Sequence, residues 1–79
     1  MNDSRLTKCF AQTLGIPVES VTDALAYNSI KQWDSVAHMA LVAAIENEFN
    51  VMLDTDEIIG LNSVAVARDV LRGKGVESP

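Results

Sequence analysis

The sequence has few of the residues from which metal centres, disulfide frameworks and large catalytic clefts are built. Its 79 residues include one cysteine, Cys9, and one histidine, His38. These two cannot form an internal disulfide or complete a structural zinc site, and the acidic segment 54–60 lacks the ligand and glycine positions of a calcium loop. So short a chain also buries only a modest core. We therefore predict a non-enzymatic protein with no metal.

Long apolar runs are also missing. The longest apolar-rich run, residues 36–45, contains His38 and is far too short to cross a bilayer. No charged leader followed by an apolar run begins the chain. We therefore expect a cytoplasmic protein that does not insert into membranes.

Basic residues are absent from the middle of the chain. From Gln32 to Ala67 there are six acids and no lysine or arginine, and the formal net charge of the whole chain is -5. Such a surface repels nucleic acids and anionic lipids, and it attracts basic patches on other proteins. We expect protein partners and no nucleic acid.

What remains is a pattern of helices, since no strand with a hairpin turn is visible. Apolar residues at helical spacing, with capping residues before them, predict one all-α domain, a small monomeric four-helix bundle over residues 1–79. The four helices are expected at about residues 3–14, 35–49, 54–59 and 63–72. A long loop, 15–33, separates the first two and is expected to pack on the core, with a single turn through Ala24–Ala26. The tail 73–79 should fray.

The short third helix has the clearest start signal. Asp54 at the N-cap faces Glu57 three residues later, and Leu53 and Ile58 are spaced for a hydrophobic staple. We expect Gly60 to end this helix, and Ser63 to cap the fourth.

The second helix has two apolar faces. On a helical wheel the core face holds His38, Leu41, Val42, Ile45 and Phe49. The opposite face is uncharged and is therefore a candidate docking surface, flanked by Glu46 and Glu48. It consists of Val36, Met39, Ala40, Ala43 and Asn47. Burial of this helix on both sides remains the alternative.

Two capping residues, Asp34 and Ser35, stand side by side before this helix. Either can accept hydrogen bonds from the first backbone amides, although a helix needs only one cap. Asp34, Ser35 and His38 also have the residue types of a hydrolytic triad, but their order at one helix start does not give triad geometry. If Asp34 is the cap, the Ser35 hydroxyl is free to point outward.

The segment Trp33–Val36 resembles the serine motif of the acyl carrier protein family. The apolar-rich helix that follows it, which ends in an acidic run and Phe49, resembles the second helix of that family. The order of the expected helices agrees with that family. The resemblance implies that a phosphopantetheinyl transferase attaches 4'-phosphopantetheine from coenzyme A to Ser35, next to Asp34. The thiol of that arm would then carry acyl groups as thioesters. Trp33 is more typical of discrete carriers from specialised pathways.

The resemblance also implies partners and an acyl pocket. The expected partners are an acyl-loading ligase or transferase and synthases or acyltransferases with basic or apolar docking patches. Ala37, Ala40 and Asn47 stand where fatty-acid carriers usually have acids, which favours apolar docking with little salt dependence. Candidate pocket residues facing the core are Leu41, Val42, Ile45, Ile59 and Leu61. The alternative hypothesis is a small acidic helical adaptor in which Ser35 is only a helix cap.

Overall fold

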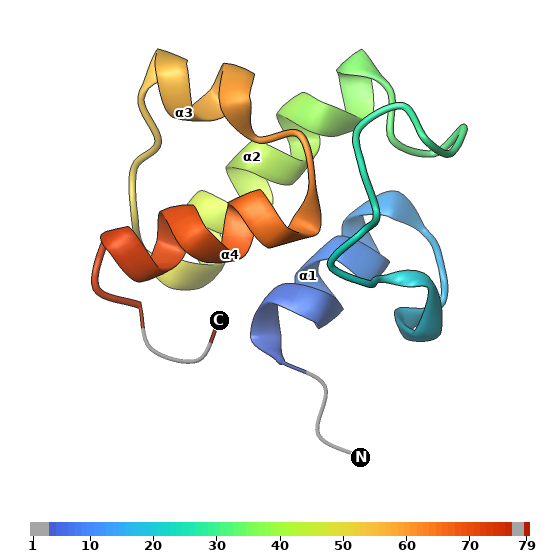
Figure 1. Ribbon diagram of the computed structural model, residues 1–79, viewed down its shortest axis with the longest axis horizontal. Coiled ribbons are helices and arrows are strands. Elements are labelled where there is room, and N and C mark those ends of the chain that lie inside the picture. The colour runs from blue at the N-terminus through green and yellow to red at the C-terminus, as the bar shows by residue number, and fades with distance from the viewer. Residues whose placement is uncertain (1–3, 77–78) are drawn as a thin grey trace.

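A computed structural model describes residues 4–76 and residue 79, and these residues form four α-helices and no strand. The helices are α1 (Arg5–Leu14), α2 (Ser35–Phe49), α3 (Thr55–Gly60) and α4 (Val64–Gly73). In Figure 1, α4 lies in front of α2, α1 lies below α2, and the short α3 lies above α4. The expected all-α, four-helix architecture with a long first loop and a short third helix is confirmed.

Three of the helices differ from the expected bounds at their ends. α1 begins at Arg5, because Ser4 is its N-cap residue and its Oγ accepts a hydrogen bond from the Thr7 amide at 3.1 Å. α3 includes Gly60 as its last residue, one position later than expected, and the C-cap residue is Leu61. α4 begins after the Ser63 cap and extends to Gly73. Residues 1–3 and 77–78, which include the expected helix start at residue 3 and part of the tail, lie outside the described residues.

Two helices end at residues with left-handed backbone conformation. Gly15 follows α1 with φ 69°, and Asn50 follows α2 with φ 54°. Glycine and asparagine are the residues that adopt this conformation at least cost, and in both places the amide of the cap residue bonds a carbonyl in the last turn. The sequence therefore stops both helices sharply.

The core is aliphatic with one aromatic pair at its centre. Helix α1 packs on α2, and the rings of Phe10 and Trp33 meet edge to face with their centroids 5.3 Å apart. Helix α2 buries the side of its wheel expected to face the core, with His38 half-buried at its edge. The fully buried large side chains include Leu6, Phe10, Trp33, Leu41, Ile45, Leu61, Val64 and Leu71.

The long connection between α1 and α2 follows the right-hand side of the molecule in Figure 1 and packs on the core. Its only helical turn is the 3-10 segment η1 (Val18–Ser20). A turn also starts at Thr22, where the Leu25 amide donates to the Thr22 carbonyl at 3.0 Å, so the turn expected through Ala24–Ala26 is present only in part and ends before Ala26. Ala26 instead forms an isolated antiparallel bridge with Ser63, just before α4. The backbone around residue 26 is therefore fixed by a distant part of the chain, which helical periodicity does not reveal.

Candidate functional site

Asp34 is the N-cap residue of α2, and Ser35 is not a cap. Asp34 Oδ1 accepts a hydrogen bond from the Ala37 amide at 2.9 Å, and its carbonyl accepts one from the His38 amide at 2.8 Å. The Ser35 hydroxyl is exposed and forms its hydrogen bond with the hydroxyl of Tyr27, with the two oxygens 2.9 Å apart. The interpretation of Ser35 as a helix cap is therefore wrong, and its hydroxyl has a partner rather than pointing freely outward.

Tyr27 is held in place from several sides. Its backbone amide donates to the Asn62 carbonyl at 2.9 Å, next to the bridge between the long connection and the residues before α4. Its ring meets Trp33 and His38 edge to face, at centroid distances of 6.3 Å and 5.3 Å. Tyr27 is 38% exposed, with its hydroxyl at the surface and its ring packed on one side.

A chain of hydrogen bonds joins the start of α2 to α3. The Trp33 indole Nε1–H donates to His38 Nδ1 at 3.0 Å, so Nδ1 is an acceptor and the ring proton lies on Nε2. His38 Nε2–H in turn donates to the Ile58 carbonyl at 2.9 Å. The Trp33 and His38 rings are also stacked, with 17° between their planes. Both ring nitrogens are engaged, and neither bonds Ser35.

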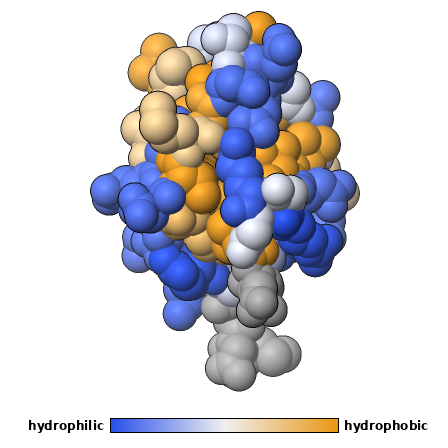
Figure 2. Space-filling view, turned by 90° about the vertical axis from the view of Figure 1, so that its left-hand side faces the viewer, coloured by the Kyte–Doolittle hydropathy of each residue, from blue (hydrophilic) through white to orange (hydrophobic). Residues whose placement is uncertain are grey.

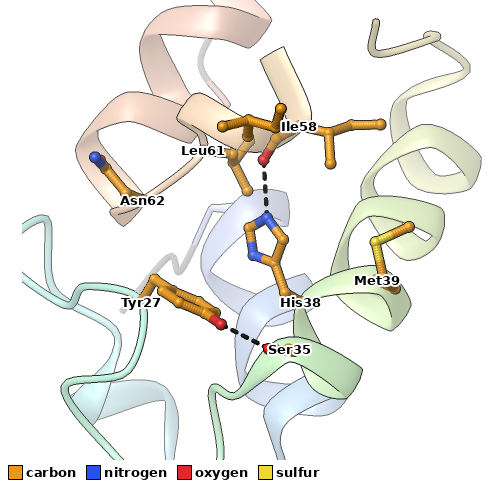
Figure 3. A pocket seen from close by; sticks show the side chains of 8 residues that line it. Tyr27, Ser35, His38, Met39, Ile58, Leu61 and Asn62 are labelled. Atoms are coloured by element: carbon orange, nitrogen blue, oxygen red, sulfur yellow. Dashed lines mark hydrogen bonds between the residues drawn. The ribbon is translucent and has the colours of Figure 1, made fainter. Parts of the chain in front are cut away.

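Next to Ser35 lies a groove of about 390 Å³ between the start of α2, the long connection and α3. Figure 3 shows the Tyr27 and Ser35 hydroxyls facing each other at one end, with His38 between them and Ile58. The surface of the groove is mostly apolar. Its lining residues are Tyr27, Ser35, His38, Met39, Ile58, Ile59, Leu61 and Asn62.

The candidate pocket residues are divided between this groove and the core. Leu41, Val42 and Ile45 are almost completely buried and do not line the groove. Ile59 does line it, but its side chain is 75% exposed, so the expectation that it faces the core is wrong. The reason is that α3 is only six residues long and presents one side to solvent. Leu61, which is buried, lines the groove as well.

The uncharged face of α2 is exposed. Val36 is 81% exposed and Met39 57%, and the other three candidate docking residues, Ala40, Ala43 and Asn47, are also exposed. Met39 both belongs to this face and lines the groove beside Ser35. Hydrophobic surface is also present on the side that carries the α2–α3 connection and α3, between strips of hydrophilic side chains (Figure 2). Burial of α2 on both sides is therefore wrong for this chain.

Most acids in the middle of the chain are bonded within the molecule. Glu46 accepts from the Leu53 amide at 2.9 Å, and Glu48 pairs with Arg5 at 2.8 Å. Asp54 and Glu57 complete the expected capping box of α3, and Glu57 also pairs with Lys74 at 2.9 Å. The hydrogen bond from the Asp54 amide, followed by the one from Lys74, lowers the pKa of Glu57. These carboxylates are therefore structural as well as surface charges.

Sequence reasoning missed three of the groove residues: Tyr27, Ile58 and Asn62. Tyr27 and Asn62 lie in irregular segments, and Ile58 contributes its backbone carbonyl as well as its side chain. The single tyrosine of the chain in an otherwise unpatterned loop was the one available signal. Among residues 4–76 and 79, no helix has the length and apolar character needed to cross a membrane, and no three His, Cys, Asp or Glu residues are grouped as metal ligands would be.

Comparison with protein families identifies the segment that contains this site. Residues 4–67 match the family model described as the phosphopantetheine attachment site. A search of the curated proteins found no match. Members of this family carry 4'-phosphopantetheine covalently attached to a serine, and they are typically carriers rather than catalysts. The match covers far more than half of the chain, so the protein belongs to the phosphopantetheine attachment site family and is a phosphopantetheine carrier of the acyl carrier protein type.

Proposed function

We propose that the protein is a non-enzymatic acyl carrier protein whose prosthetic group is attached to Ser35. The observation that supports this choice is how the serines of the matched segment are used. Ser4 and Ser63 cap helices, and the Ser29 hydroxyl donates to the Ala26 carbonyl at 2.6 Å. Ser20 is the last residue of η1 and does not line the groove. Ser35 is the serine whose hydroxyl opens on the groove.

The surroundings of Ser35 fit a phosphodiester. Ser35 is the first residue of the fifteen-residue α2, where the leading amides have no carbonyl acceptor inside the helix and the helix dipole favours an anion. Asp34 already satisfies the Ala37 amide, which leaves the amides of Ser35 and Val36 nearest to a negative group on Ser35 Oγ. The adjoining groove offers an apolar surface to the arm.

The attachment reaction is a group transfer that needs a separate enzyme. Ser35 Oγ forms a bond to the coenzyme A phosphorus that bears the pantetheine, the diphosphate bond breaks, the hydroxyl proton passes to a base of the transferase, and adenosine bisphosphate leaves. The attached arm supplies a terminal thiol that carries acyl groups as thioesters. His38 cannot serve Ser35 as a base in this conformation, because both of its ring nitrogens bond elsewhere.

The expected partners dock on the apolar face of α2. Glu46, Glu48 and Glu57 are bonded to cations or amides of the chain itself, whereas Val36, Met39 and Ile59 are exposed close to Ser35. We therefore propose that the transferase, the loading enzyme and the acyl-using enzymes, in the cytoplasm, meet this face with apolar side chains. Basic residues on a partner would steer the encounter from a distance.

The test is modification by a promiscuous phosphopantetheinyl transferase. The purified protein is incubated with coenzyme A and the transferase, and its intact mass is measured. We expect one adduct on the wild type and on Ser29→Ala, which removes another exposed hydroxyl, and none on Ser35→Ala. The absence of an adduct on the wild type, or its presence on Ser35→Ala, would contradict the proposal. The adaptor alternative predicts that Ser35→Ala retains function, whereas a carrier would stay folded and lose it.

A further inference from the structure

We infer that Tyr27 is a positioning residue for the prosthetic group, and that its hydroxyl donates a hydrogen bond to the phosphodiester on Ser35. This inference rests on the proposed attachment to Ser35. It assigns a specific donor, contributed by the long connection between α1 and α2, to the first atoms of the arm.

The first support is the position of the Tyr27 hydroxyl. It lies 2.9 Å from Ser35 Oγ, the atom on which the phosphorus would be placed, and both residues line the same groove (Figure 3). The non-bridging oxygens of a phosphodiester lie one bond beyond that phosphorus. They therefore come within the reach of a hydroxyl that already contacts Oγ.

The second support is that the hydroxyl is held there by contacts that do not involve Ser35. The hydrogen bond from the Tyr27 amide to the Asn62 carbonyl fixes the backbone, and the Trp33 and His38 rings fix the phenol ring. These contacts remain when Ser35 is modified. Little conformational freedom is lost when the hydroxyl binds a new acceptor, which makes it a preorganised donor.

Modification also changes what Tyr27 can bond. In the unmodified protein either hydroxyl can donate to the other. Esterification removes the Ser35 proton, so Tyr27 must then be the donor. The non-bridging phosphodiester oxygens carry the negative charge, and hydrogen bonds to charged acceptors are shorter and stronger than hydrogen bonds between neutral groups. The Tyr27 hydroxyl thus changes its acceptor, from Ser35 Oγ to an oxygen of the phosphoryl group.

The consequence is a preferred direction for the arm. A phosphodiester held between Tyr27 and the first turn of α2 starts the arm at the mouth of the groove, where Met39 and Ile59 present exposed apolar surface. Without the Tyr27 hydroxyl, the first bonds of the arm would rotate more freely. Tyr27 therefore favours an arm that lies along the groove.

The experiment compares the phosphorus NMR signals of the modified wild type, Tyr27→Phe and Ser29→Ala. Tyr27→Phe keeps the ring and removes only the hydroxyl. Ser29→Ala removes a different hydroxyl from the same loop, one that bonds Ala26 and not Ser35. We expect the signal of Tyr27→Phe to shift and sharpen, because the phosphodiester loses a donor and gains mobility. We expect Ser29→Ala to match the wild type.

A second measurement needs no variant. In the modified wild type we expect nuclear Overhauser effects between the Tyr27 ring protons and the methylene next to the phosphate. Absence of these effects, an unchanged signal in Tyr27→Phe, or an equal shift in Ser29→Ala would overturn the role of Tyr27. Failure of the wild type to accept the arm at all would instead refute the attachment to Ser35, and with it the basis of the inference.

Discussion

Removal of the Asp34 side chain should lower the stability of the fold, whereas removal of the Ser35 hydroxyl should remove function with little change in stability. Asp34 Oδ1 accepts the Ala37 amide at 2.9 Å, whereas the Ser35 hydroxyl bonds only the exposed Tyr27 hydroxyl. Asp34→Ala should therefore destabilise the fold, and Ser35→Ala should leave it nearly unchanged while abolishing attachment of the arm.

The magnitude follows from the contacts. Asp34→Ala leaves the Ala37 amide to water and removes a carboxylate from the positive end of α2, and lost caps cost about 1 kcal/mol, within a range of about 0.5–2 kcal/mol. For a domain of this size, each kcal/mol lowers the melting temperature by about 4–8 °C. Ser35→Ala loses one exposed neutral hydrogen bond and places a good helix former in the first turn, so we expect a change below about 0.5 kcal/mol.

The assay is thermal and urea unfolding followed by far-ultraviolet circular dichroism. Asp34→Asn is the matched control, because asparagine is an equally good cap and should recover most of the stability lost in Asp34→Ala. If Ser35→Ala lost as much stability as Asp34→Ala, the assignment of separate roles to these neighbours would be refuted.

Four other measurements test further parts of the structure. Trp33→Phe leaves His38 Nδ1 without its donor in a packed site, so urea unfolding should show a loss of about 2–3 kcal/mol; a loss below about 0.5 kcal/mol would contradict the hydrogen-bond chain. Burial raises the pKa of the Cys9 thiol, so in time-resolved mass spectra iodoacetamide should label the arm of the modified protein much faster than Cys9. Because the Asp54 amide and then Lys74 lower the pKa of Glu57, its stabilising contribution is present above the usual glutamate pKa and is lost as the pH falls through the lowered value; acid titration of Glu57→Gln should show a smaller loss of stability than the wild type. If docking is apolar, the KM of the transferase for this protein should change little between about 0.05 and 0.5 M salt. A steep rise in that KM with salt would indicate ionic docking.

The helices could be predicted because their signals are local. The capping box of Asp54 and Glu57 and the cap at Ser63 depend on residues only three positions apart. The core face of α2 follows from the spacing of its apolar residues in the same way. Ser35 was singled out by the resemblance of residues 33–36 and the helix after them to the carrier serine motif, which is also a local feature of the sequence.

The groove could not be predicted, because contacts between distant segments build it. The Tyr27 hydroxyl contacts Ser35, and the Tyr27 backbone is held by a hydrogen bond to the carbonyl of Asn62, thirty-five positions further along the chain. His38 was expected at the edge of the core, but its partners, the Trp33 indole and the Ile58 carbonyl, belong to a segment outside α2 and to the backbone of α3. Helical periodicity describes one element at a time, so it placed Ser35 at the start of α2 without revealing the residues that surround it.

The acids show why net charge alone is a poor guide to docking in this protein. Six acids without a nearby basic residue in sequence suggested a strongly negative surface. In the fold, however, Glu48 meets Arg5 and Glu57 meets Lys74, both from outside the acidic segment, and Glu46 bonds a backbone amide. A carboxylate that is already paired must lose that partner before it can bind a basic residue on another protein, which reduces the net gain from such a contact. The exposed apolar side chains near Ser35 have no such cost, so they are the better candidates for the contacts that hold a partner in place.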